Sequence, residues 1–270
     1  AEVAREIEEM NQQRREVDEK TTADALAQLE KSDTGPFVNI VHGRDWHRGV
    51  VGIVASRMIE QRYRPSIVLS EEDGHLIGSA RSVDGIDIHH ALEECSDLLQ
   101  QFGGHTMAAG LSLKIEQLAE FKIRLNQAIA KQSNDVLPKP IVRCDREVHI
   151  GELSLEAWKE LQQLEPFGPG NPTPVFILRN VVCVRPPRTI GNQGRHLKIT
   201  VKDPEGDFPT IDAIGWNMGE LAPHIKQDMP VDIAFTLVKN TWKPRGWQNR
   251  TELNLHLKAI RKAGTDLAAT

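Results

Sequence analysis

The stretch FGGHTMAAG, residues 102–110, combines two adjacent glycines, a histidine and a second run of small residues between two segments with helical spacing. Gly103 and Gly104 lack a Cβ atom, so the backbone can approach another group closely or take a positive φ. His105 places an imidazole beside backbone N–H groups, which is one way to form a small anion pocket, usually for phosphate. A tight turn is the alternative, and this stretch alone leaves both open.

A second candidate contact for an anion lies upstream, in GSARS at residues 78–82. Ser79 and Arg81 stand two residues apart on a segment predicted to be a strand, so their side chains point to the same side. A guanidinium binds two phosphate oxygens at once, and a serine hydroxyl adds a donor. Alone, Arg81 equally fits a surface residue that caps the next loop. Proximity to residues 103–105 on one sheet would favour phosphate binding.

The residues around both motifs alternate between strand and helix patterns, which predicts a small α/β domain over residues 35–135. Strands are expected at residues 37–41, 66–70, 75–81 and 108–113. Asp73-Gly74 predicts a hairpin turn. Helices are expected where apolar residues recur at helical spacing, at residues 46–61, 86–101 and 115–133.

Two further polar clusters begin predicted helices. His47 and Arg48 could contact a phosphate or a 5′ end, because a helix N-terminus attracts anions. Structural packing around Trp46 is the alternative. Asp87-Ile88-His89-His90 invites a manganese or zinc site. We favour Asp87 as the N-cap of a helix instead, because Ile88 interrupts the motif and no further aspartates follow nearby.

The first 31 residues form one polar helical pattern with no capping residue before Glu2 and no initiator methionine. Helices normally begin with Ser, Thr, Asp or Asn. We therefore expect residues 1–34 to be a connector helix that continues into a missing N-terminal domain.

Residues 136–174 read as a linker with a short helix capped by Ser154, followed by a Pro/Gly-rich connector at residues 166–174. Five strand candidates follow, at residues 176–184, 196–202, 210–216, 231–240 and 251–260, with a helix-like interruption at residues 218–225. This pattern predicts an OB-fold barrel over residues 175–262, which binds oligonucleotides across one face, with a tail at residues 263–270. A small SH3-like barrel or half-sandwich would give a similar pattern.

Basic and aromatic residues mix in this β-rich part. Residues 171–270 carry 14 basic and 9 acidic side chains, whereas residues 1–170 carry 19 and 29. Cations neutralise a nucleic-acid backbone and aromatic rings stack on bases, so the mixture favours single-strand binding. The candidates are Arg195, Lys198, Lys239, Trp242, Lys243, Arg245, Trp247 and Arg250. Phe208 is expected in the barrel core, and Trp216 fits either role.

Composition bounds the cellular setting. The chain has 270 residues and a net charge of −5, and no apolar run approaches the ~20 residues of a membrane span. We see no signal peptide pattern. Three widely spaced cysteines argue against a disulfide framework or a zinc site, so we expect a cytoplasmic protein.

Three segments resemble the RecJ family of DHH exonucleases, in the family's order. They are WHRGVVGIVASRMIEQRYRPSIVLS (residues 46–70), GSARSVDGIDIHHALEECSDLLQQFGGHTMAAGLSL (residues 78–113) and EPFGPGNPTPVF (residues 165–176). FGGH with a following AAG is typical of the DHH-associated domain. The Pro-Gly-Asn-Pro connector before an OB-like domain narrows the resemblance to RecJ.

The resemblance implies single-strand-specific 5′→3′ DNA exonuclease activity in repair and recombination. Two metal ions, Mn²⁺ or Mg²⁺, would be held by a separate DHH domain and would activate a water for attack on the terminal phosphodiester. Ser79, Arg81, Gly103, Gly104 and His105 would line the phosphate-holding side, and the OB domain would admit single strands. It also implies single-strand-binding protein and a helicase as partners of a monomer.

This sequence lacks a contiguous Asp-His-His motif and the aspartates that accompany it in the family. We therefore expect no metal ligands here, and expect the chain to bind but not cut. The alternatives are a non-catalytic single-stranded nucleic-acid-binding module and a relative of the nanoRNases or nucleotide phosphodiesterases. The last generally lack an OB extension.

Overall fold

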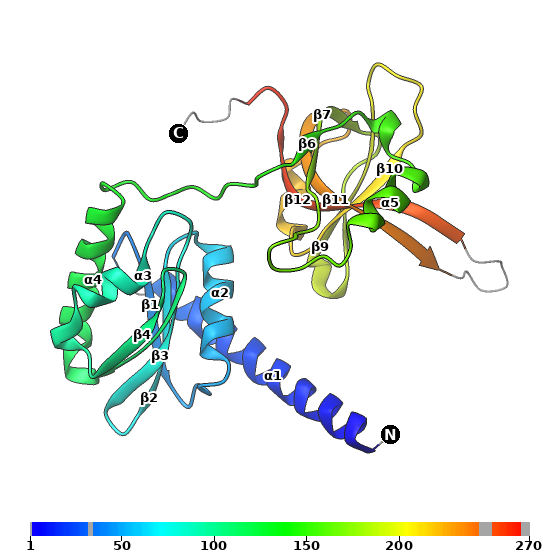
Figure 1. Ribbon diagram of the computed structural model, residues 1–270. Helices are drawn as coiled ribbons and strands as arrows, with labels where there is room; N and C mark the ends of the chain where they lie inside the picture. The colour runs from blue at the N-terminus through cyan, green and yellow to red at the C-terminus, as the bar shows by residue number, and fades with distance from the viewer. Residues whose placement is uncertain (1, 32–34, 243–249, 266–270) are drawn as a thin grey trace. The chain divides into compact units, whose positions relative to one another are not determined.

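The computed structural model describes residues 2–31, 35–242 and 250–265. The chain divides into two compact units, Ala1–Pro140 and Ile141–Thr270 (Figure 1). No helix in the described ranges is both long and apolar enough to cross a membrane.

The first unit is built on a mixed sheet with strand order β1-β2-β3-β5-β4, in which only β1 and β2 run parallel. Its strands are β1 (Asn39–Arg44), β2 (Ser66–Glu72), β3 (His75–Arg81), β4 (Gln101–His105) and β5 (Ala108–Lys114). The predicted Asp73-Gly74 turn is confirmed, since both residues take positive φ values of 48° and 76° between β2 and β3. Both positive values suit the tight turn of a two-residue hairpin.

Helices cover the two faces of this sheet (Figure 1). On one face, α3 (Ile88–Glu93) and α4 (Leu118–Gln132) close a core around Leu69, Leu111 and Phe121. On the other face, α2 (Val51–Gln61) and the last turns of α1 (Glu2–Lys31) pack over β1 and β2 through Leu29, Val54 and Val68. The single long N-terminal helix agrees with the sequence prediction.

Two helix predictions in this unit are wrong at their ends. The helix expected at residues 86–101 ends at Glu93, a 3₁₀ turn follows as η1 (Ser96–Leu98), and the chain then forms β4. Residues 101–105 pair with residues 108–112 of β5, and at Gln101, the last residue of the predicted helix, these ladder hydrogen bonds outweigh the local helical pattern. The helix expected from residue 46 begins at Val51, and the last predicted helix is η2 (Ile115–Gln117) followed by α4.

The second unit is a barrel-like sheet. Its strands are β6 (Arg146–Glu147), β7 (Phe176–Cys183), β8 (Arg188–Ile190), β9 (His196–Lys202), β10 (Ile211–Gly215), β11 (Pro230–Trp242) and β12 (Arg250–Lys262). The strands are ordered β6-β7-β11-β12-β10-β9-β8, and a short β7–β9 pairing at Val182 and Cys183 brings the sheet back on itself. A five-strand ring β7-β9-β10-β12-β11 results, with β10 parallel to β12. The 3₁₀ helix η6 (Gly219–His224) stands between β10 and β11.

This arrangement confirms the predicted OB-type barrel, closed only loosely because two residue pairs join β7 to β9. Alternating residues of the ring strands fill the interior, among them Leu197, Phe235 and Leu255. The sequence prediction missed the short strands β6 and β8, which are too brief to show a period.

Residues 141–174, treated in the sequence as part of a linker, lie within the second unit. They contribute β6, the 3₁₀ turns η3 (Ile150–Glu152) and η4 (Gln162–Leu164), and α5 (Leu155–Leu161). Ser154 caps α5 as predicted, because its hydroxyl accepts a hydrogen bond of 3.1 Å from the Ala157 N–H. Val148, Trp158 and Leu161 pack on the barrel core, which explains why this segment is not free.

Candidate nucleic-acid interface

Strand register in the first unit brings the two predicted motifs onto one face of the sheet. Ser79 of β3 pairs with Gly110 of β5, which pairs with Gly103 of β4. In the next row, Arg81 pairs with Ala108 and Ala108 with His105. Neighbouring strands lie ~4.8 Å apart, so the backbones of Arg81 and His105 are about 10 Å apart. We call this surface, formed by Ser79, Arg81, Gly103, His105 and Gly110, the glycine strip.

The floor of the glycine strip is bare backbone. A Cβ built at Gly103 meets nothing within 4 Å, and one at Gly110 reaches only the Gly78 carbonyl oxygen at 3.9 Å. Both glycines are exposed. Packing therefore does not require glycine at either position, whereas a ligand that approaches the backbone closely would.

Gly104 does not belong to this floor. It pairs with the buried Ala109, one residue out of phase with Gly103, and so faces the core side. Its φ is 152°, and a Cβ there would lie 2.2 Å from the Ala108 carbonyl oxygen. The strand geometry thus explains why residue 104 is a glycine. The other four residues predicted to bind phosphate, Ser79, Arg81, Gly103 and His105, share one surface.

Arg81 is held at the edge of the strip beside α2. Its Nη1 donates to Ser79 Oγ at 2.6 Å and to the Ala80 carbonyl at 2.8 Å. A Cβ at Gly52, in the first turn of α2, would lie 2.7 Å from Arg81 Nη2 and 3.3 Å from Ser79 Oγ. The absence of a side chain at Gly52 therefore allows the helix to approach the guanidinium.

The start of α2 lies at this point, where the Ile53 N–H already donates to the Val50 carbonyl oxygen at 2.9 Å. Val50 at the N-cap position makes no side-chain cap, and the first turn holds no acidic residue. The first N–H groups of a helix lack intrahelical acceptors and favour anions. A cavity of about 310 Å³ lies here, lined by Arg48, Gly49, Val51, Gly52, Ile53, Ile77, Gly78, Ser79 and Arg81.

His47 and Arg48 lie in the turn before α2 and not on the helix itself. His47 Nδ1 accepts a hydrogen bond of 3.0 Å from the Gly49 N–H, so this ring supports the turn. Arg48 lines the cavity but is paired with Glu72. Arg48 therefore lines the cavity, and His47 does not.

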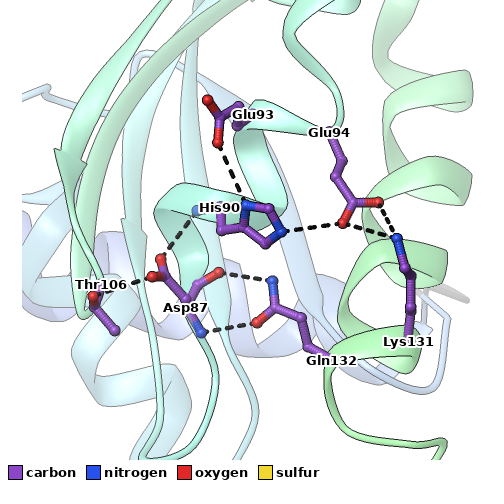
Figure 2. Close-up of polar contacts among 7 residues, drawn as sticks. All are labelled: Asp87, His90, Glu93, Glu94, Thr106, Lys131 and Gln132. Carbon is purple, nitrogen blue, oxygen red and sulfur yellow. Dashed lines mark hydrogen bonds and ion pairs between the residues drawn. The ribbon is translucent and has the colours of Figure 1, made fainter.

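The Asp87 segment is engaged in structural contacts (Figure 2). Asp87 Oδ1 accepts from the His90 N–H at 3.0 Å, which confirms the predicted N-cap and is the main reason that the pKa of Asp87 lies below its ordinary value. His89 lies 5.6 Å from the Phe102 ring, and the His90 imidazole contacts Glu93 and Glu94. Within the described ranges, no three His, Cys, Asp or Glu side chains form a metal-sized group.

On the second unit, the predicted cations differ in availability. Arg195 is exposed just before β9. Lys198 Nζ is paired with Asp212 Oδ2 at 2.7 Å, and Thr200 Oγ1 donates to Asp212 Oδ1 at 2.6 Å. Burial pulls the pKa of Asp212 upward, but these hydrogen bonds hold it below its ordinary value. Lys239 is exposed, and its ammonium lies 5.1 Å from the Trp158 ring centroid.

Several predicted contacts cannot be placed. Lys243, Arg245 and Trp247 lie outside the described residues. The backbones of Trp242 and Arg250 pair at the ends of β11 and β12, but their side chains are not described.

Trp216 follows β10 and is an exposed aromatic that the sequence left undecided. Its side chain is 52% exposed. His196 of β9 and His256 of β12 stand edge-on to it, with ring centroids 4.7 Å and 5.7 Å away. Burial and Lys258 lower the pKa of His256. Ala213 and Gly215 of β10 face inward, so the alternation along this strand is the sequence signal that could have predicted an exposed Trp216.

The prediction that Phe208 belongs to the barrel core is wrong. Phe208 is 40% exposed and packs edge-on against His149, with ring centroids 4.8 Å apart. It lies in the loop before β10, and a Cβ at Gly151 or Gly206 would contact its ring. The strand alternation that fills the core begins only at Ile211.

The fold defines a protein with two units, a small α/β domain that carries the glycine strip and an OB-type barrel. Family models agree with that division. The DHHA1 domain matches residues 34–131, and the RecJ OB domain matches residues 144–259. The glycine strip lies in the first match and Trp216 in the second.

Curated relatives match most of this chain and are themselves longer. The chain is 34% identical over 246 residues to the single-stranded-DNA-specific exonuclease RecJ of Bacillus subtilis, covering 90% of this chain and 31% of the relative. The Escherichia coli protein of that name is 34% identical over 225 residues, covering 80% and 38%.

A solved structure is similar in fold. The crystal structure of RecJ in complex with Mn²⁺ from Thermus thermophilus superposes with a TM-score of 0.74 at 27% identity, covering 96% of this chain and 36% of that one. The chain belongs to the RecJ family. It corresponds to the part of these proteins that carries the DHHA1 and OB domains, about a third of the curated relatives' length.

Proposed function

We propose that this chain is the substrate-holding part of a single-stranded-DNA-specific 5′→3′ exonuclease that acts in DNA repair and recombination. The observation that carries this proposal is the glycine strip, because its backbone is bare while Arg81 and His105 stand at its two edges. Relatives that share both domains are named single-stranded-DNA-specific exonucleases.

The glycine strip would hold phosphates of the strand near its 5′ end. Arg81 and Ser79, with the uncapped start of α2, supply donors at one edge, and His105 supplies a donor at the other. Exposed Gly110 and Gly103, which lie beside Ser79 in the row next to Arg81, Ala108 and His105, let the nucleotide backbone approach the sheet directly. His47 and Arg48 would contribute from the preceding turn. Gly104 would act indirectly by allowing the course of β4.

The barrel would hold the rest of the single strand. In OB folds, the second and third strands of the barrel, here β9 and β10, form the usual binding face. Trp216, flanked by His196 and His256, offers a ring for base stacking on this face. Arg195 and Lys239, together with the predicted residues at and beyond the end of β11, would neutralise phosphates.

We place the hydrolysis itself outside this chain. Mn²⁺ or Mg²⁺ bound by a DHH domain would supply an activated water for attack on the phosphodiester. Asp87 and His89, the best local candidates, do not fit a metal, because Asp87 caps α3 and His89 packs on Phe102. We therefore expect the 270-residue chain to bind single strands without cutting them.

The domain division follows from this function. We propose α1 as the connector to the catalytic domain, residues 35–135 as the phosphate-holding domain and residues 175–262 as the strand-holding domain. The protein would act as a cytoplasmic monomer with single-strand-binding protein and a helicase as partners. Co-purification with either partner is the direct check on that last point.

Fluorescence anisotropy tests the proposal. The chain should bind a labelled oligothymidylate and discriminate against a blunt duplex of the same length. Incubation with Mn²⁺ should leave the oligonucleotide intact. Robust cleavage would show that the chain holds its own metal site, and equal affinity for duplex and single strand would contradict the role given to the barrel.

A further inference from the structure

The turn between β4 and β5 is fastened to the start of α3. The Ile88 N–H donates to the Thr106 carbonyl oxygen at 3.0 Å. Thr106 Oγ1 donates to Asp87 Oδ2 at 3.2 Å (Figure 2). Thr106 directly follows His105, so these two contacts act on the strand end that carries the imidazole.

Asp87 is itself held firmly. Gln132, in the last turn of α4, accepts from the Asp87 N–H at 2.9 Å and donates to the Asp87 carbonyl at 3.0 Å (Figure 2). The second carboxylate oxygen accepts from the His90 N–H at 3.0 Å. With its main chain and one oxygen fixed, the other oxygen of Asp87 has a set direction toward Thr106.

The far side of the turn is tied to β3. The Ser82 N–H, directly after Arg81, donates to the Met107 carbonyl at 2.9 Å. The Met107 N–H in turn donates to His105 Nδ1 at 3.3 Å. One turn therefore connects the His105 ring to both the α3 N-cap and the strand that carries Arg81.

This geometry selects one form of the imidazole. A ring nitrogen that accepts a backbone N–H bears no proton, so the proton of a neutral ring sits on Nε2. His105 is exposed on the glycine strip, so this N–H can donate to a ligand acceptor.

We propose that Asp87, acting through Thr106, is a positioning residue that keeps His105 as an Nε2–H donor on the glycine strip. The ligand acceptor would be a phosphate oxygen, and that part rests on the proposed function. A purely structural role for Asp87 would stabilise α3 and leave the tautomer of His105 unchanged.

Nitrogen-15 NMR of the histidine rings in the 270-residue chain tests this directly. The wild-type spectrum should show His105 protonated on Nε2. Thr106→Val removes the hydroxyl donor to Asp87 and retains the α3 cap, and should shift the ring toward the Nδ1–H tautomer. Thr106→Ala removes the same hydroxyl without a branched side chain. Thr106→Ser should restore the wild-type signal.

The matched control is Thr22→Val, which removes another threonine-to-aspartate hydrogen bond, from Thr22 to Asp18 at 3.3 Å in α1. It should leave the His105 signal unchanged. An unaltered His105 tautomer in both folded Thr106 variants would overturn the proposal, as would an Nδ1–H ring in the wild type.

A titration with oligonucleotides separates the positioning role of Asp87 from the proposed function. A 5′-phosphorylated oligothymidylate added to the labelled chain should move the His105 Nε2 resonance, and the 5′-hydroxyl form should move it less. Thr106→Val should weaken the response several-fold. Suppose that substitution of Thr106 changes the His105 tautomer, but neither oligonucleotide moves the His105 Nε2 resonance. The positioning role of Asp87 would then be supported, and phosphate binding by the glycine strip would be contradicted.

Discussion

Gly103 and Gly104 are adjacent in the chain but have different environments. Gly103 faces open space, whereas Gly104 has a φ of 152° and no room for a Cβ. The backbone therefore requires glycine at position 104, whereas at position 103 glycine leaves room for the ligand of the proposed function. Sequence reasoning grouped the two because both simply lack a side chain.

Alanine at each position separates these duties. Gly104→Ala should lower the free energy of unfolding by at least ~1–3 kcal/mol, the cost of one strained backbone position, with the contact to Ala108 in addition. Gly103→Ala is the matched control and should unfold at nearly the wild-type denaturant midpoint. Its affinity for a single strand should fall. Equal destabilisation by both changes would contradict this assignment.

The pH dependence of stability reports on Asp87. Its pKa lies below the ordinary carboxyl value because the His90 N–H donates to it. A depressed folded pKa stabilises above the unfolded pKa, and this stabilisation disappears as the pH falls through the folded pKa. Wild type should exceed Asp87→Ala by ~1 kcal/mol at neutral pH, typical of an N-cap. Urea melts should show the gap narrowing in acid, and a gap independent of pH would contradict it.

At the scale of elements, the barrel strands determine which charges and rings are available. Lys198 of β9 lies diagonally across from Asp212 of β10, and its ammonium pairs with the Asp212 carboxylate at 2.7 Å. Trp216 ends β10 and keeps an exposed ring. Strand pairing thus leaves Lys198 neutralised by Asp212 and therefore less available to a phosphate. It also leaves the Trp216 ring exposed, which composition alone could not predict.

Trp216→Ala should weaken single-strand binding by ~1–3 kcal/mol, the range for the loss of one base-stacking ring. Trp216→Phe retains an aromatic face and should keep most of the affinity. Anisotropy titrations at fixed salt measure both, together with a thermal melt that should change little. Wild-type affinity in Trp216→Ala would remove this ring from the interface.

Lys198 should matter less than Arg195, because Asp212 already neutralises it. Arg195→Ala should therefore reduce the salt dependence of binding more than Lys198→Ala does. Asp212→Asn frees the Lys198 ammonium and should strengthen binding. Plots of affinity against salt concentration give these slopes directly. A larger loss from Lys198→Ala than from Arg195→Ala would refute this order.

At the scale of the whole molecule, the chain has two units with separate cores, and we propose a different role in DNA binding for each. The first unit carries the glycine strip and the second carries the barrel face. Under the proposed function, most non-specific affinity should come from the barrel, because a long strand would contact it over several nucleotides. The strip should instead act on the strand end.

Substitutions in the intact exonuclease should separate these contributions. His105→Ala and Arg81→Ala should slow cleavage markedly and weaken binding of long strands only slightly. Binding by wild type should fall steeply with salt, since phosphate contacts release counterions. Single-turnover cleavage and equilibrium binding on one substrate make the comparison. A parallel loss of both in Arg81→Ala would place the strip in general strand binding.

The sequence by itself determined the class of each half of this protein. Periodicity and turn residues placed most strands, the long first helix and the Ser154 cap, because these depend on neighbours in the chain. Residue chemistry likewise singled out Ser79, Arg81 and His105.

Only the tertiary structure decided how these residues combine. Pairing of β3 with β5 brings Ser79 and Arg81 beside residues 108–110, and β4 then adds Gly103 and His105 to the same sheet. Strand structure also put Gly103 and Gly104 on opposite faces of β4, and in the barrel it set Lys198 beside Asp212 and left Trp216 exposed. The conformational preferences of single residues are weak compared with a ladder of strand hydrogen bonds and a packed core. Strand register, and the face of the sheet on which each side chain lies, are therefore set only when the chain folds.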